Sequence, residues 1–212
     1  MTLVKVCGLT RECDVHHAVE KGAAACGFVL SASPRQVAST RARELATEAR
    51  DVLTVAVVTT ESGEWIAAAL VESGLRAVQL SAGADGPSVA EMRAAAGRQG
   101  LRPLVIAAAD TPDAASADFT QLDARRPGVY GGTGVALDWR ALAQTALPPK
   151  ERLVVAGGLT PGNVGEAVAA LQPSMVDVCS GTEAAPGVKD KGLLAGFFAA
   201  VADADYARGA SA

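Results

Sequence analysis

The stretch Val4-Lys5-Val6-Cys7-Gly8 is a short β-strand pattern that begins four residues into the chain and stops at a glycine. Side chains alternate across a strand, so Lys5 and Cys7 share one face, roughly 6.6 Å apart. A cation beside a thiol favours the thiolate, the form of cysteine that acts as a base or a nucleophile. The alternative interpretation is that Cys7 is a small buried hydrophobic residue and Lys5 an edge charge.

This strand opens a pattern that repeats along the whole chain: a short β-branched run, a loop with Gly, Pro or Ser, and an Ala-rich amphipathic helix. Eight runs are predicted as strands, at residues 3–7, 25–30, 53–58, 77–80, 103–107, 119–122, 153–156 and 175–179. Caps and periodicity predict the helices, at residues 12–21, 40–50, a segment ending at 74, 88–99, a short segment after 112, 138–145, 160–171 and a last segment ending near 204.

Eight strand–helix units in sequence imply parallel strands joined by right-handed crossovers. Eight strands close a barrel without an edge strand, and about 200 residues is the compact end of that fold. The competing fold is an open doubly wound sheet, which usually has a glycine-rich turn after its first strand. Here that turn reads Cys7-Gly8-Leu9-Thr10. We therefore predict an α/β fold, a TIM (β/α)8 barrel, with one domain over residues 1–204 and a frayed tail over 205–212.

Composition excludes several classes of function. The 212 residues carry a net charge of −4, from 19 basic and 23 acidic side chains. The sequence has no basic cluster, so we expect no nucleic-acid partner. No apolar run approaches the ~18 residues of a membrane span. The chain enters a strand pattern at once, so we expect no signal peptide. None of its four cysteines forms a Cys-x-x-Cys pair. We expect a cytoplasmic protein with reduced thiols and no membrane partner.

A metal site is the weaker interpretation of one cluster. Cys13 and His17 would share a helix face beside His16. A zinc site needs further ligands elsewhere in the chain, and both histidines already belong to this cluster. We therefore expect no metal.

The carboxyl ends of the barrel strands and the loops after them are where the active site of this fold lies. The residues predicted there are Cys7, Arg35, Gln79, Asp123, Gly157, Gly158, Ser180 and Gly181. The loops after strands 7 and 8 usually bind phosphate, and small residues let backbone N–H groups approach an anion. The alternative is that these glycines only end strands. An acid at Asp123 and a base at Cys7 would suit an isomerisation, unless Asp123 is an exposed loop residue.

In a closed barrel strand 8 lies beside strand 1. We therefore expect Asp177 to pair with Lys5 and to moderate its effect on Cys7, whose pKa the surroundings should lower. We also expect Cys13, Cys26 and Cys179 to be less reactive than Cys7, with Cys179 as the exception if there is one.

Ordered motifs along almost the whole chain resemble those of phosphoribosylanthranilate isomerase, a family of tryptophan biosynthesis. They are Lys5-Val6-Cys7-Gly8-Leu9-Thr10, Gly27-Phe28-Val29, Ser33-Pro34-Arg35, Val78-Gln79-Leu80, Leu122-Asp123, Gly131-Gly132-Thr133-Gly134 before Asp138-Trp139, Ala156-Gly157-Gly158-Leu159, Val176-Asp177-Val178, and Ser180-Gly181 with Glu183, Pro186-Gly187 and Lys189-Asp190.

The resemblance implies an Amadori rearrangement of N-(5-phosphoribosyl)anthranilate without cofactor or metal, by a monomer or a homodimer. It implies Asp123 as the general acid toward the furanose ring oxygen and Cys7 as the base that takes the C2′ proton. Arg35 would face the anthranilate carboxylate. The implied substrate-binding residues are Lys5, Arg35, Gln79, Gly132 and Asp177, and the implied phosphate-binding residues are Gly157, Gly158, Ser180 and Gly181.

Three residues, in two places, depart from the family pattern. Ser81 and Ala82 follow Val78-Gln79-Leu80, where the family commonly has His-Gly, and Leu137 stands where Phe is usual. Two other functions stay open from sequence: a barrel that binds a phosphosugar with little turnover, and a dual-substrate isomerase that also serves histidine biosynthesis. Enzymes of the latter kind usually rely on two aspartates, and Cys7 stands where the first would be.

Overall fold

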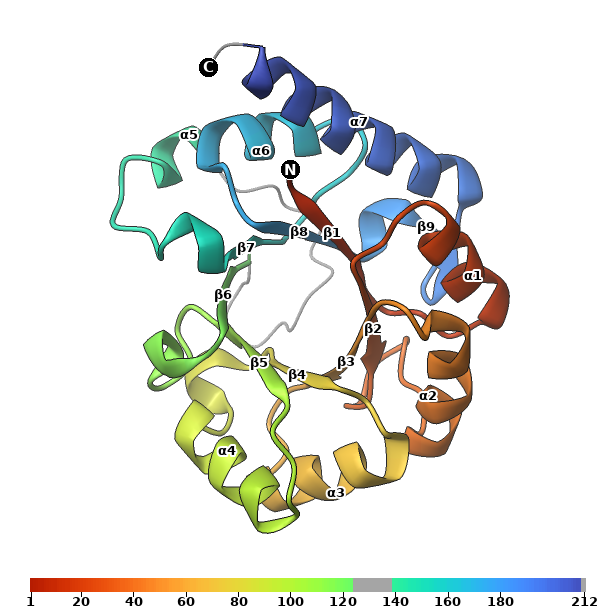
Figure 1. The fold of residues 1–212 in the computed structure, drawn as a ribbon, viewed down its shortest axis with the longest axis vertical. Coiled ribbons are helices and arrows are strands. Elements are labelled where there is room, and N and C mark those ends of the chain that lie inside the picture. The colour runs from red at the N-terminus through yellow and green to blue at the C-terminus, as the bar shows by residue number, and fades with distance from the viewer. Residues whose placement is uncertain (124–138, 211–212) are drawn as a thin grey trace.

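A closed barrel of eight parallel strands forms the centre of the molecule, as the sequence predicted (Figure 1). The structure is a computed structural model that describes residues 1–123 and 139–210. The strands pair in chain order, and β1 closes the barrel by pairing with β8. Their bounds are β1 Leu3–Val6, β2 Ala25–Val29, β3 Leu53–Val58, β4 Ala77–Leu80, β5 Leu104–Ala108, β6 Phe119–Leu122, β7 Leu153–Val155 and β8 Met175–Val178.

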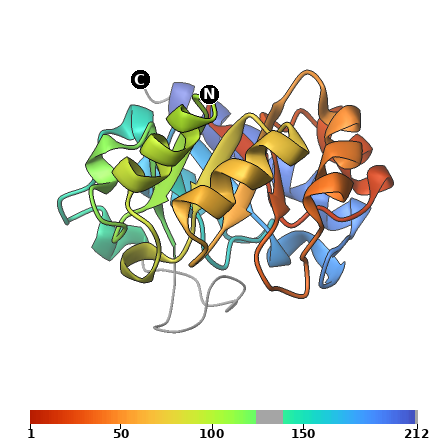
Figure 2. The ribbon, with the colours of Figure 1, turned by 90° about the horizontal axis from the view of Figure 1, so that it is seen from below.

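Helices surround the barrel on its outside, and Figure 2 shows them from the side. Their bounds are α1 Glu12–Glu20, α2 Ser39–Ala46, α3 Gly63–Ser73, α4 Val89–Arg98, α5 Trp139–Leu142, α6 Val164–Leu171 and α7 Lys191–Gly209. A small hairpin, β9 (Glu183–Ala185) with β10 (Val188–Lys189), follows β8. Within the described ranges, no helix has the length and apolar character to cross a membrane.

Local sequence signals account for several helix ends. Ser88 and Glu91 form the predicted capping box at the start of α4. Gly74 ends α3 in the left-handed conformation, which a glycine adopts without strain. The Thr160-Pro161 signal marks a turn instead, and α6 begins only at Val164, behind an N-cap at Asn163.

Other boundaries differ from the prediction. After β5 the chain forms a three-residue 3₁₀ turn (Ala114–Ser116) in place of the short helix. The tail expected from residue 205 is helical through 209, and Asp205 accepts a hydrogen bond of 2.9 Å from the Thr2 hydroxyl. This contact joins the two ends of the chain and explains why the helix continues. The predicted cap at Asp138 lies outside the described residues.

The core has two layers, because alternate strand residues face opposite sides of the sheet. The larger layer lies between strands and helices and contains Phe28, Leu80 and Phe197. The smaller one fills the barrel interior with Cys7, Ala25, Val55, Val57, Ala77, Ile106, Val154 and Met175. The residues of β1 alternate between the two, so Lys5 and Cys7 point inward as the sequence predicted.

Gly27 on β2 leaves interior space for the side chains of β1. A Cβ placed on Gly27 would lie 3.0 Å from Cys7 Sγ and 3.1 Å from Lys5 Nζ. Both distances are shorter than normal packing contacts, so a side chain at residue 27 would have to displace groups in a tightly packed interior.

We expect Gly27→Ala to lower the free energy of unfolding by about 1–3 kcal/mol, the usual cost of overpacking an interior. Gly97, exposed in α4 with nothing within 4 Å of an added Cβ, is the matched control. Gly97→Ala should instead stabilise the protein by roughly 0.5–1 kcal/mol, because alanine favours a helix. Urea unfolding of the three proteins measures both changes, and equal stability of Gly27→Ala and the parent would contradict this account.

Candidate active site

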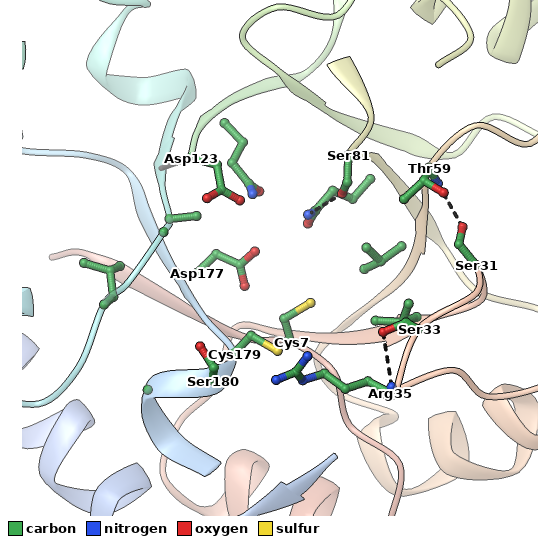
Figure 3. Close-up of a pocket in the computed structure, with 18 of the residues that line it drawn as sticks. Cys7, Ser31, Ser33, Arg35, Thr59, Ser81, Asp123, Asp177, Cys179 and Ser180 are labelled. Carbon is green, nitrogen blue, oxygen red and sulfur yellow. Dashed lines mark hydrogen bonds between the residues drawn. The ribbon is translucent and has the colours of Figure 1, made fainter. Parts of the chain in front are cut away.

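A pocket opens at the carboxyl ends of the strands (Figure 3). It brings together most of the residues that the sequence predicted for the site: Cys7, Arg35, Gln79, Asp123, Gly157, Gly158, Asp177, Ser180 and Gly181. Lys5 is absent from this lining, and Gly132 lies outside the described residues. The barrel geometry therefore gathers residues from seven of its strand ends, all but that of β5, around one space.

Lys5 lies beneath the pocket and forms the predicted ion pair with Asp177. Its side chain is 0% exposed, and Nζ lies 2.8 Å from Asp177 Oδ2. The two residues are register partners on β1 and β8, so both side chains enter the interior at the same level. Burial by itself would lower the pKa of Lys5, but the charges of Asp177 and Cys7 outweigh it and raise that pKa, which keeps the ammonium charged.

Cys7 is the pocket residue whose surroundings most clearly favour its reactive thiolate form. Its pKa is lowered to about 7, first by a hydrogen bond from the Cys179 thiol, with burial acting in the opposite direction. The charges of Lys5 and Lys189 lower it further, while Asp177 raises it, which is the moderating effect predicted from sequence. The sequence prediction included the contribution of Lys5 but not the larger one of Cys179, although Cys179 follows Asp177 at the same spacing as Cys7 follows Lys5. The pKa of Cys179 is correspondingly raised, by the same hydrogen bond and by burial.

Three buried oxygen atoms of the pocket lack a hydrogen-bond partner within the part of the chain that the structure describes: Gln79 Oε1, Gln121 Oε1 and Asp177 Oδ1. An unsatisfied buried polar atom costs about 1–3 kcal/mol, so three of them in one cavity require an explanation. A polar ligand that donates hydrogen bonds would satisfy them. The pocket is therefore suited to a hydroxyl-rich molecule.

Asp123 stands at the end of β6 and points into the same pocket as Cys7, from another part of the wall (Figure 3). Asp123 is intermediate in exposure and lines the pocket, which favours a site residue over an exposed loop residue. Gln121, two residues earlier, faces the interior by strand alternation. A thiol and a carboxylate on separate strands can act on two atoms of one bound molecule.

Arg35 is held by Glu183 rather than lying free for a ligand. Nε and Nη2 of Arg35 donate to both carboxylate oxygens at 2.7–3.1 Å. Glu183 also accepts from Lys189 Nζ at 3.1 Å and is almost fully buried. Burial would raise the pKa of Glu183, but these two cations lower it. The paired guanidinium retains Nη1, which has no partner among the described residues.

The loops after β7 and β8 meet at the pocket rim. Gly157 and Gly158 have φ values of 86° and 64°, a region that favours glycine. A Cβ on Gly181 would lie 1.8 Å from the Leu159 carbonyl oxygen, so this position also requires glycine, for close approach of the two loops. Asn163 holds the first loop by accepting from Thr160 N (2.7 Å) and donating to Gly158 O (2.9 Å). The predicted phosphate loops are therefore adjacent and tightly packed.

The alternative metal cluster on α1 does not assemble in the described structure. His16 lies 3.4 Å from Glu48, and His17 lies 3.3 Å from the Lys191 carbonyl oxygen. Across residues 1–123 and 139–210, no three His, Cys, Asp or Glu side chains are placed to hold a metal ion.

Comparison with known proteins identifies the family. The family model of N-(5'-phosphoribosyl)anthranilate (PRA) isomerase matches residues 4–200 of the sequence. This chain belongs to that family. An N-(5'-phosphoribosyl)anthranilate isomerase from Ralstonia nicotianae is 40% identical, with 99% of this chain and 96% of the relative covered. The crystal structure of the isomerase from Thermus thermophilus is 36% identical with a TM-score of 0.79, covering 95% of this chain and 99% of that one.

A further solved structure in the family holds a ligand. It is phosphoribosylanthranilate isomerase in complex with reduced 1-(o-carboxyphenylamino)-1-deoxyribulose 5-phosphate, 30% identical to this chain with a TM-score of 0.73. The similarity covers 96% of this chain and 100% of the chain in that structure.

Sequence reasoning missed four residues of the site: Gln121, Asn163, Cys179 and Glu183. Gln121 could have been found from its spacing of two residues from Asp123 on one strand. Asn163 could have been found as a polar residue after Gly157-Gly158. Cys179 could have been found beside Cys7, because it follows Asp177 by two residues just as Cys7 follows Lys5. Nothing in the sequence pairs Glu183 with Arg35, because both residues lie in loops beyond the strand register.

The Cys7 thiolate predicts a specific alkylation profile. Because the thiolate is the reactive form, the rate with iodoacetamide should rise as pH increases and reach half its maximum near pH 7, the pKa of Cys7. Cys26 provides an internal control, because burial raises its pKa to about 12 and should leave it unreacted over this range.

Cys179→Ala removes the hydrogen bond with the largest effect, so it should shift the Cys7 midpoint to higher pH. Mass spectrometry of the alkylated peptides measures both rates. A Cys7 midpoint unchanged in Cys179→Ala would show that the thiol contact does not stabilise the thiolate.

Proposed function

We propose that this chain isomerises N-(5'-phosphoribosyl)anthranilate to 1-(2-carboxyphenylamino)-1-deoxyribulose 5-phosphate, a step of tryptophan biosynthesis, by general acid–base catalysis. The observation that carries the proposal is that Cys7, with its pKa near neutrality, and Asp123 face one pocket from separate strands. Family membership supports the reaction, and the ligand-bound relative supports the kind of molecule that fits.

In this mechanism Asp123 protonates the furanose ring oxygen, and the ring opens to a Schiff base. The Cys7 thiolate then removes the C2′ proton, and the resulting enol amine becomes the ketone. A base works best when its pKa is close to the working pH, and about 7 meets that condition for Cys7. The two groups act on different atoms, which explains why they stand on separate strands.

The remaining pocket residues bind the substrate. Gly157, Gly158, Ser180 and Gly181 would hold the phosphate through backbone N–H groups, since small residues permit close approach. The orphan oxygens of Gln79, Gln121 and Asp177 would accept from the ribose hydroxyls. Arg35, oriented by Glu183, would offer Nη1 to the anthranilate carboxylate.

Lys5 has an indirect role in this proposal. We expected it to bind substrate, but its ammonium is completely buried against Asp177. It therefore acts by charging the interior beneath Cys7 and by orienting the Asp177 carboxylate. The Gly132 assignment stays a prediction from sequence, because that residue lies outside the described ranges. The compartment we propose is the cytoplasm, where the four free cysteines would stay reduced.

The direct test is turnover of phosphoribosylanthranilate by the purified chain, with the aminoaldose of histidine biosynthesis as a second substrate. We expect turnover of the first substrate and far less of the second. Binding of the product analogue without turnover would favour the alternative of a phosphosugar-binding barrel, and comparable rates on both substrates would favour a dual-substrate enzyme.

Asp123→Asn should remove nearly all of kcat and change KM only slightly, because an amide cannot protonate the ring oxygen but keeps the shape of the side chain. Asp203→Asn, on the exposed face of α7, makes the same chemical change away from the pocket and should leave the kinetics unchanged. An Asp123→Asn enzyme with kcat within a few-fold of the parent would overturn the assignment.

A further inference from the structure

The two cysteines of the pocket lie on adjacent strand ends. The register of β1 and β8 pairs Val6 with Val178, and the Cys7 backbone N–H continues it by donating to Val178 O at 2.8 Å. Cys7 and Cys179 are the next positions in this register. Neighbouring strands are about 4.8 Å apart, and disulfides join Cα atoms separated by roughly 4.4–6.8 Å.

The side chains also meet. Cys179 is the neighbour that lowers the pKa of Cys7 most, and its Sγ lies 3.8 Å from Glu183 Oε1. The same Sγ packs against the backbone next to Cys7, since a Cβ on Gly8 would lie 2.8 Å from it. Figure 3 shows the two sulfur-bearing side chains next to each other on the pocket wall, and both residues line the pocket. A small solute that enters the pocket can therefore reach both residues.

We propose that Cys7 and Cys179 form a reversible disulfide when the protein meets a peroxide, and that this modification turns the site off. The loss of activity, though not the disulfide itself, rests on the proposed function, because the bond would consume the thiolate that serves as the base.

The chemistry balances with hydrogen peroxide as the oxidant. The Cys7 thiolate attacks one peroxide oxygen, the O–O bond breaks, and Cys7 becomes a sulfenic acid as hydroxide leaves and takes up a proton to form water. The Cys179 sulfur then attacks the Cys7 sulfur, its proton passes to the departing hydroxide, and a second water forms. Two thiols are oxidised by two electrons, and one peroxide is reduced to two waters.

The other two cysteines are placed differently. Cys26 pairs in register with Val6 and belongs to the outer core layer, so strand alternation directs it away from Cys7. Cys13 lies exposed on α1 outside the barrel. Of the four thiols in the chain, only Cys179 is positioned to resolve a sulfenic acid on Cys7.

Peptide mapping tests the proposal without relying on activity, because trypsin places each cysteine on its own peptide. After treatment of the folded, reduced protein with hydrogen peroxide and blocking of the remaining thiols, we expect a cross-link between peptides 6–11 and 153–189 that dithiothreitol removes. In Cys179→Ser the cross-link should be absent and Cys7 should accumulate as sulfinic acid, which dithiothreitol does not reverse. Cys13→Ser is the control and should form the cross-link as the parent does.

Turnover of phosphoribosylanthranilate, measured on the same samples, should be almost abolished by peroxide and restored by dithiothreitol. If the reduced protein turns over its substrate but peroxide leaves peptides 6–11 and 153–189 unlinked, the disulfide proposal is overturned and the proposed function is not. If the cross-link forms but the reduced protein has no turnover, the proposed function fails while the modification site stands.

Discussion

The ion pair between Lys5 and Asp177 inside the barrel is the interaction on which the rest of the site depends. A fully buried ammonium is tolerated only with a charged, hydrogen-bonded partner, and loss of one partner of such a pair costs about 3–5 kcal/mol. Closure of the barrel supplies that partner, because it places β8 beside β1. Gly27 supplies the space, since its missing side chain leaves room for the Lys5 ammonium and the Cys7 thiol.

The charge beneath the pocket organises the groups above it. It helps to lower the pKa of Cys7, and it fixes one oxygen of Asp177 while the other stays available to a ligand. A second charged group, formed by Arg35, Glu183 and Lys189, contacts Cys179, whose Sγ lies 3.8 Å from Glu183 Oε1. Cys7 and Cys179 thus lie between the Lys5–Asp177 ion pair and this second charged group. The thiolate that serves as the base is also the group that would react with peroxide.

The barrel and much of the site could be predicted from sequence, because each depends on local signals. Strand runs, a capping box and glycines at strand ends act within a few residues, and barrel closure then placed Asp177 beside Lys5. What sequence could not provide were side-chain contacts between loops outside the strand register, such as Arg35 with Glu183. The contact with Glu183 changed the expected role of Arg35, since it engages most of the guanidinium. Lys5 pairs with Asp177 as expected, but its full burial leaves it outside the pocket lining. Helix lengths also differed where tertiary contacts decided them, as at Asp205.

The assignment of Cys7 as the catalytic base is the central claim, and kcat of reduced Cys7→Ser with phosphoribosylanthranilate tests it most directly. Serine keeps the size of the side chain, but its hydroxyl is far harder to ionise, so kcat should fall to nearly zero while the product analogue still binds. Cys13→Ser, measured beside it, should match the parent. A Cys7→Ser enzyme with kcat within a few-fold of the parent would contradict the account and require another residue as the base.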